Sequence, residues 1–138
     1  MRAIVIDRTI PVGKFSVRAE TLTIREDDDE FEFVWSIQPA PVRLEAVRDP
    51  DSGRVRLEHF LTRLPIWWRI RDDVGREYAA DGGGSEAGEG ERWRSQYGYR
   101  PAPPSDVGEL LLTLSEIRPH EDVAEREIET IRVPLKPA

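Results

Sequence analysis

Hydrophobic and polar residues alternate along most of this chain, and a period of two is typical of a β-strand with one buried face. The alternation is clearest at four large apolar residues separated by single positions: Phe31, Phe33, Trp35 and Ile37. The same pattern predicts further strands around residues 42–47, 55–59, 66–71, 110–114 and 131–135. We therefore expect eight or nine short strands, separated by turns about every ten residues.

Two local features refine this prediction. The turn residues of Asp49–Gly53 lie between two alternating segments, which predicts a β-hairpin. Residues 15–24 also alternate, but the phase slips by one residue between Ala19 and Leu22, and a β-bulge would explain the slip. Residues 121–129 leave two interpretations open, a loop or a short helix, because their apolar residues also have helical spacing.

A chain of 138 residues has the length of one domain, so we treat residues 1–138 as a single domain. Many short strands and little helix favour a two-layer sandwich. Trp35 in a central strand resembles the core tryptophan of immunoglobulin-like domains, although no cysteine pair accompanies it. We predict an all-β fold, an immunoglobulin-like β-sandwich of about eight antiparallel strands with one long glycine-rich loop.

The predicted loop starts in the glycine-rich segment 81–91, continues through the aromatic and arginine residues of segment 93–100, and ends at the prolines of segment 101–104. Long irregular segments in small domains are commonly functional. Trp, Tyr and Arg dominate binding hot spots, and Tyr, Ser and Gly are typical of binding loops on immunoglobulin scaffolds. The candidate contact residues are Trp93, Arg94, Tyr97, Tyr99 and Arg100. The alternative interpretation is that these aromatic side chains fold back and cover an open end of the sheet.

Trp67 is a further candidate contact residue. Its register in the predicted strand 66–71 places it on the solvent side, opposite Ile66 and Trp68. An exposed tryptophan between arginines suggests an interface, although a cation–π contact with Arg69 would explain it without a partner.

Composition narrows the classes of function. The formal net charge is −7, from 27 acidic and 20 basic residues, which disfavours binding to nucleic acid. The chain has no cysteine, which excludes disulfides, zinc–thiolate sites and thiol catalysis. No stretch approaches the roughly 20 apolar residues of a membrane span, and the N-terminus is too short and too soon charged for a signal peptide. We therefore expect a cytoplasmic protein that binds neither membranes nor nucleic acid.

No motif indicates catalysis or a cofactor. Gly82-x-Gly84-x-x-Ala87 matches a relaxed dinucleotide fingerprint but lacks the preceding strand and the following helix start. The two histidines, His59 and His120, are isolated and cannot supply a hydrolytic triad or a histidine-rich metal site. The acidic run 26–30 lacks a calcium-loop pattern and is interpreted as a hydrated turn. We expect no catalytic residue, no metal and no cofactor.

A longer pattern covers residues 64–117. A strand ends in an Asp-x-x-Gly turn at 72–75, an aromatic residue opens the next strand, and a glycine-rich segment leads through prolines into the leucines of 110–114. This arrangement resembles uncharacterised proteins of high-GC bacteria and small immunoglobulin-like bacterial domains. The resemblance implies a sandwich fold and carries no established activity and no catalytic positions.

These observations predict a non-enzymatic protein-interaction or structural module that contacts a protein partner through segment 93–100. The alternative is a carbohydrate- or small-ligand-binding sandwich that uses exposed Trp and Tyr side chains. An enzyme would need carboxylates converging with a histidine. Edge strands make a homodimer plausible, whereas the alternation of Arg and Glu along residues 43–58 is typical of edge protection and favours a monomer.

Overall fold

The computed structural model describes residues 1–61, 66–87, 92–117 and 126–136, and this part of the chain is all-β. A single 3₁₀ turn, η1 (Glu26–Asp28), and no α-helix occur among these residues. The ten described strands are β1 (Arg2–Val12), β2 (Phe15–Arg25), β3 (Glu30–Gln38), β4 (Val42–Arg48), β5 (Val55–Leu61), β6 (Ile66–Asp72), β7 (Glu77–Ala87), β8 (Trp93–Arg100), β9 (Glu109–Glu116) and β10 (Arg126–Pro134).

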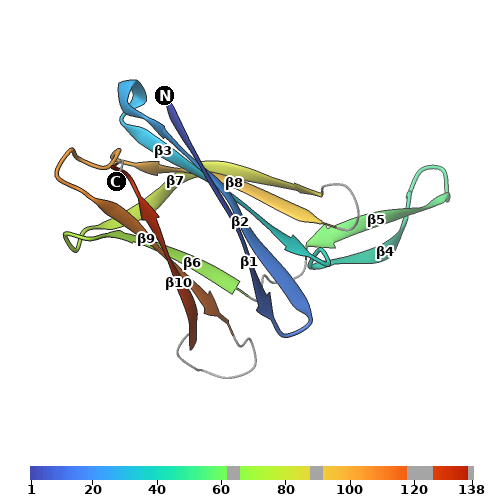
Figure 1. Cartoon of the computed structure of the whole chain (residues 1–138). Coiled ribbons are helices and arrows are strands. Elements are labelled where there is room, and N and C mark those ends of the chain that lie inside the picture. The colour runs from blue at the N-terminus through green and yellow to red at the C-terminus, as the bar shows by residue number, and fades with distance from the viewer. Residues whose placement is uncertain (62–65, 88–91, 118–125, 137–138) are drawn as a thin grey trace.

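Eight strands form one antiparallel sheet in the order β1-β2-β3-β8-β7-β6-β9-β10. The sheet curls until its two edge strands approach each other, so it is nearly closed into a barrel (Figure 1). Arg8 on β1 forms an ion pair of 2.8 Å with Glu129 on β10, and Arg2 Nη1 donates a hydrogen bond of 2.5 Å to the carbonyl oxygen of Leu135. The prediction of an all-β fold is confirmed. The immunoglobulin-like sandwich is not confirmed, because the eight strands belong to one continuous sheet.

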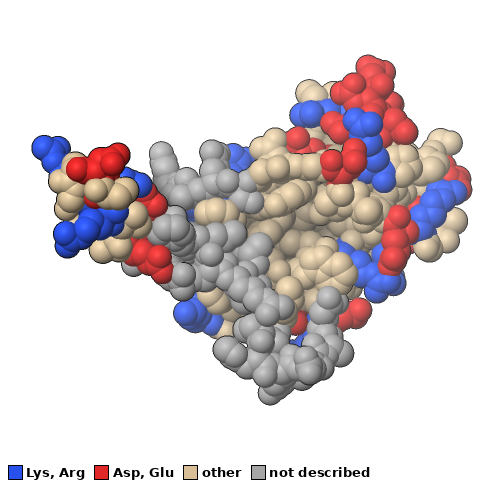
Figure 2. Space-filling view, turned by 180° about the vertical axis from the view of Figure 1, so that it is seen from behind, with Lys and Arg blue, Asp and Glu red and all other residues tan. Residues whose placement is uncertain are grey.

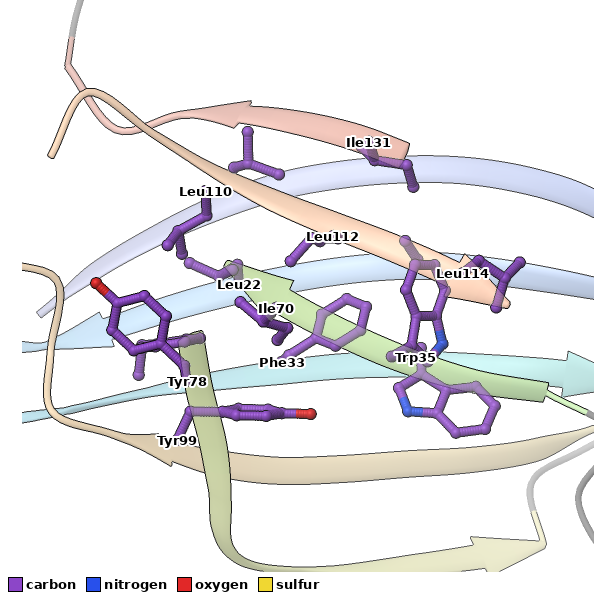
Figure 3. Close-up of a cluster of buried hydrophobic side chains, with 14 of the residues drawn as sticks. Leu22, Phe33, Trp35, Ile70, Tyr78, Tyr99, Leu110, Leu112, Leu114 and Ile131 are labelled. Carbon is purple, nitrogen blue, oxygen red and sulfur yellow. The ribbon is translucent and has the colours of Figure 1, made fainter. Parts of the chain in front are cut away.

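The interior of the curled sheet is filled by side chains from its facing strands (Figure 3). Phe33 on β3 meets Trp68 on β6 edge to face, with 5.1 Å between ring centroids. Phe31 stacks on Tyr99 at 5.2 Å and meets Tyr78 edge to face at 5.3 Å. Trp35 is only 5% exposed, so the predicted central strand with an inward tryptophan is confirmed.

The predicted bulge in segment 15–24 is also confirmed. Ala19 pairs with Trp35 and Thr21 pairs with Val34, which leaves Glu20 without an opposite residue on β3. Val17 and Leu22 are both fully buried on either side of this irregularity. The bulge therefore corrects the phase of β2 and keeps both halves of the strand facing the core.

Strands β4 and β5 form the predicted hairpin, but they make a separate two-stranded sheet that projects from the barrel (Figure 1). We call this hairpin, residues 42–61, the arm. Its turn is fixed by Asp49, whose N–H donates to the carbonyl oxygen of Arg54 at 2.9 Å and whose Oδ1 accepts from the N–H of Asp51 at 2.8 Å. Gly53 takes a positive φ of 70°, which glycine adopts without strain.

The predicted long loop is wrong. Residues 81–87 lie in β7 and residues 93–100 form β8, and the two strands pair from Ala79↔Arg100 to Ala87↔Trp93. At Gly83 the two strands approach so closely that a side chain would overlap Gln96 O and Tyr97, whereas Gly82 and Gly84 have no neighbour within 4 Å of an added methyl group. Residues 88–91 lie outside the described residues.

The interpretation of residues 121–129 as a helix or loop is resolved only in part. Residues Arg126–Pro134 form strand β10, so the end of that segment is extended and not helical. It pairs with β9, with a register shift between Glu127 and Glu129. Residues 118–125 lie outside the described part of the chain.

Candidate aromatic binding cleft

Strand β8 separates the predicted contact residues onto two faces, because alternate side chains of a strand point in opposite directions. Tyr99 is buried and Trp93 and Tyr97 are half-buried, and all three pack against the core. Arg94 and Arg100 are exposed on the outer face. The five residues that the sequence placed together on one loop therefore form two groups.

A cleft opens where the sheet is least continuous. Strands β6 and β7 pair only through Ile70↔Tyr78 and Arg71↔Glu77, and beyond these pairs they diverge (Figure 1). The opening has a volume of about 520 Å³. Seen from the side opposite to Figure 1, the middle of the molecule is hollowed and its described surface is mostly free of charged side chains (Figure 2).

Aromatic side chains from four strands line this cleft. The six aromatic residues are Trp35, Trp67, Trp68, Tyr78, Tyr97 and Tyr99. Aliphatic side chains complete the walls, with Ile66 and Ile70 on β6 and Ala79 and Ala80 on β7. The arrangement suits uncharged groups with apolar faces, since aromatic rings offer large contact areas at low cost in rotamer entropy.

Three of the six predicted contact residues lie at this cleft: Trp67, Tyr97 and Tyr99. Trp67 is 44% exposed on the outer side of β6, as its register predicted. Arg69 forms an ion pair with Glu77 across the narrow end of the cleft. The rim therefore carries one compensated charge pair beside an accessible tryptophan.

Trp35 and Trp68 were assigned only to the core by sequence reasoning, and Tyr78 was treated as the start of a strand. Their alternation correctly placed Trp35 and Trp68 inside, but nothing local showed that the sheet opens beside them. The only available signal was the small volume of Ala79, Ala80 and the following glycines. A strand with so little side-chain volume leaves neighbouring rings uncovered.

Hydrogen-bond donors lie in the cleft and beside it. Trp68 Nε1 is buried and has no hydrogen-bond partner among the described residues, and the same holds for Trp93 Nε1 beside the core. Burial, with a smaller contribution from Tyr97, raises the pKa of Tyr99 to about 12, so its hydroxyl keeps its proton at neutral pH. Tyr99 lines the cleft, so its hydroxyl can donate to an acceptor on a bound molecule.

A buried carboxylate fixes the narrow end of the cleft. Asp72 is 2% exposed and accepts hydrogen bonds from Tyr78 Oη at 2.7 Å and from the N–H groups of Val74 and Arg76 at 2.9 Å each. Burial alone would raise the pKa of Asp72, but these hydrogen bonds and the Arg76 guanidinium together hold that pKa below its usual value. Asp72 thus caps the β6–β7 turn.

Arg94 and Arg100 line a second hollow, on the outer face of β3, β8 and β7, with a volume of about 560 Å³. Its floor contains Gly82, Gly83, Gly84 and Gly98. Arg100 pairs with Asp81 at 3.1 Å and with Glu30 at 3.5 Å, and Arg94 lies 3.8 Å from Glu20. Because acidic neighbours already compensate both guanidinium groups, this hollow offers no net positive site for an anion.

The remaining sequence candidates add no chemistry to these sites. In the described segments, no group of three or more His, Asp or Glu side chains is arranged to hold a metal ion. The acidic run 26–30 forms η1 and its flanks, and Asp29 accepts the N–H of Ala102 through both its carbonyl oxygen and Oδ1. His120 lies outside the described residues.

No helix in the described part of the chain has the length and apolar character to cross a bilayer.

Comparisons of the chain with protein-family models, with curated proteins and with solved structures gave no match.

Proposed function

We propose that this chain is a non-enzymatic binding module and that the cleft between β6 and β7 is its binding site for an extended, apolar segment of a protein partner. The observation that carries the proposal is the aromatic cleft in the incomplete part of the sheet. Six aromatic residues meet there, where the neighbouring strands β6 and β7 separate.

Free backbone groups support an extended ligand. Beyond Tyr78, β7 pairs with β8 on one side, and no strand among the described residues pairs with its other side. Likewise, Ile66–Arg69 of β6 pairs only with β9. Peptides add to such edges through main-chain hydrogen bonds, while alternate side chains enter pockets that provide specificity. Apolar side chains of an added strand would enter the aromatic cleft.

The experiment fills the cleft without changing the rest of the molecule. Ala80→Leu places a larger side chain in the cleft, and Ala3→Leu is a matched change at an exposed alanine of β1. Extended peptides would first be selected from a displayed library on the wild-type chain, and their affinities then measured by tryptophan fluorescence. We expect Ala80→Leu to weaken binding roughly tenfold or more and Ala3→Leu to leave it unchanged.

The two faces of β8 give a second control. Arg94→Ala combined with Arg100→Ala changes only the outer face, so we expect peptide binding to be retained. Failure to select any apolar peptide, or equal affinity for wild type and Ala80→Leu, would show that the cleft does not bind an extended segment.

A second candidate function is the binding of a small ligand with an apolar face, such as a carbohydrate. The specific observation in its favour is the size of the cleft, because about 520 Å³ falls within the usual range of small-molecule pockets. Titration of glycan and metabolite panels would then quench tryptophan fluorescence in the wild type and in Ala3→Leu, but not in Ala80→Leu.

A relationship to immunoglobulin-like sandwiches stands as a further proposal. Its support is that β3 and β6, from opposite sides of the core, pack their rings against each other at Phe33 and Trp68. Among the described residues, strands β1, β2, β3, β8 and β7 are joined by backbone pairing to strands β6, β9 and β10 only through the two residue pairs between β7 and β6. Loss of those two pairs would divide the sheet into two facing sheets.

A further inference from the structure

The arm is a small sheet of two strands. Its two strands pair only with each other, and no third described strand adds to either edge. Val55 and Leu57 on β5 are 57% and 65% exposed, which is unusual for large apolar side chains in a strand. A two-stranded hairpin is marginally stable in water unless a further strand or layer packs on it. A further strand added to the arm would therefore stabilise it.

The free edge of β5 has a defined set of backbone groups. In an antiparallel pair, hydrogen-bonded and non-hydrogen-bonded residue pairs alternate. The N–H of Asp49 donates to the carbonyl oxygen of Arg54 next to the turn, so the pairs Val47↔Arg56 and Glu45↔Glu58 are hydrogen-bonded within the arm. The backbone groups of Val55 and Leu57 consequently point away from β4, toward the open edge.

We propose that β5 pairs with β5 of a second copy of this chain, in an antiparallel register centred on Leu57. The two Leu57 residues would exchange main-chain hydrogen bonds across a twofold axis, and their side chains would meet on the apolar face. The two arms together would form a four-stranded sheet, and a sheet of three or more strands with an apolar face can be stable. This interface is isologous and closes at the dimer.

The charged side chains beside Leu57 favour the register centred on that residue. Arg56 and Glu58 flank Leu57 and lie on the opposite face of β5, where they form an exposed ion pair within one chain. In the register centred on Leu57, Arg56 of each copy lies opposite Glu58 of the other copy, and opposite charges across an antiparallel pair are stabilising. A register centred on Arg56 or on Glu58 would place like charges opposite each other. The alternating charges therefore protect the edge against other pairings and permit this one.

The test is a charge exchange measured by size-exclusion chromatography with light scattering. We expect the wild-type chain to be a dimer. Arg56→Glu and Glu58→Arg each place like charges opposite each other, so each variant should dimerise roughly tenfold or more weakly. The double variant R56E/E58R restores opposite charges and should dimerise as the wild type does. An equimolar mixture of the two single variants should form a heterodimer.

Two control variants distinguish dimerisation through β5 from binding at the cleft. Arg132→Glu makes the same charge change at an exposed position of β10 and should remain dimeric, as should Ala80→Leu in the cleft. A monomeric wild-type chain, a dimeric Arg56→Glu variant with undiminished affinity, or single variants that do not associate when mixed would each overturn the proposal. Circular dichroism on each variant verifies that the barrel is folded.

Discussion

Strands β3 and β7 flank β8 in the same sheet, yet they contribute to the interior in opposite ways. The inward residues of β3 are Phe31, Phe33, Trp35 and Ile37, all at most 5% exposed. The corresponding part of β7 carries Ala80 and three consecutive glycines. Both strands pair with β8 over most of its length. The backbone of the sheet is therefore continuous on both sides of β8, while the core is filled on one side only.

This difference shows that strand pairing and core filling are separate consequences of the sequence. Glycine lowers the β-propensity of β7, but it permits the close approach at Gly83. The volume that β7 does not supply leaves Tyr97 and Tyr99 facing the cleft. A cleft has formed here through missing side-chain volume, with the rings of the core as its walls.

The largest predicted effect on stability comes from a change on β3, the strand that fills the core. Phe33→Ala removes a fully buried ring that packs on Trp68, and it should lower the free energy of unfolding by about 3–5 kcal/mol. The measurement is urea denaturation followed by tryptophan fluorescence. Val5→Ala, at a residue 76% exposed on β1, is the matched control and should change stability by less than about 0.5 kcal/mol. Equal effects of the two changes would contradict the assignment of the core.

The next effect concerns the narrow end of the cleft, where β7 is held to β6. Asp72→Ala leaves Tyr78 Oη and two backbone N–H groups without their acceptor, which should cost roughly 2–4 kcal/mol of stability. Thermal denaturation of the variant beside the wild type measures this cost.

The pH dependence of Asp72 has a definite sign. Because the pKa of Asp72 is lower in the folded than in the unfolded chain, its contribution is present above the ordinary value of 3.8 and is lost as the pH falls below it. Asp72→Asn should show less of this acid destabilisation than the wild type. Identical acid profiles would indicate that the carboxylate does not stabilise the fold as a charged group.

The smallest predicted effect is a difference in stability between alanine substitutions at two glycines of β7. A methyl group on Gly83 would overlap Gln96 O and Tyr97, so Gly83→Ala should cost about 1–3 kcal/mol. Gly84 has no neighbour within 4 Å of an added methyl group, so Gly84→Ala should be neutral or slightly stabilising. Melting temperatures of the two variants provide the comparison. A neutral Gly83→Ala would mean that β7 and β8 pair less closely than the structure shows.

The sequence predicted most strands because alternation is a local property. The patterns at 31–37, 42–47, 55–59, 66–71 and 110–114 correspond to described strands, and the phase slip before Leu22 is a bulge. The prediction failed at β7, where glycine has no side chain to alternate. At β8 the alternation was present, from Trp93 through Ser95 to Tyr97, but the abundance of Gly, Tyr and Arg was interpreted as a loop.

The cleft was only partly predictable for a different reason. Exposure of Trp67 follows from its register alone, whereas the cleft depends on where two strands separate. The strands that separate, β6 and β7, are consecutive in sequence, but β6 pairs along its length with the distant strand β9 while β7 pairs with β8, and no local pattern encodes this choice of partners. Trp68 could be assigned to the interior from its neighbours, but its position at an opening could not.

The bulge in β2 has a consequence for how this strand tolerates changes in length. Glu20 is the residue without an opposite partner on β3, so deleting it would restore strict alternation from Val17 through Ala19 to Leu22. Deleting Thr23 instead would send every later side chain of the strand to the wrong side of the sheet. We therefore expect deletion of Glu20 to destabilise the chain less than deletion of Thr23, three residues away.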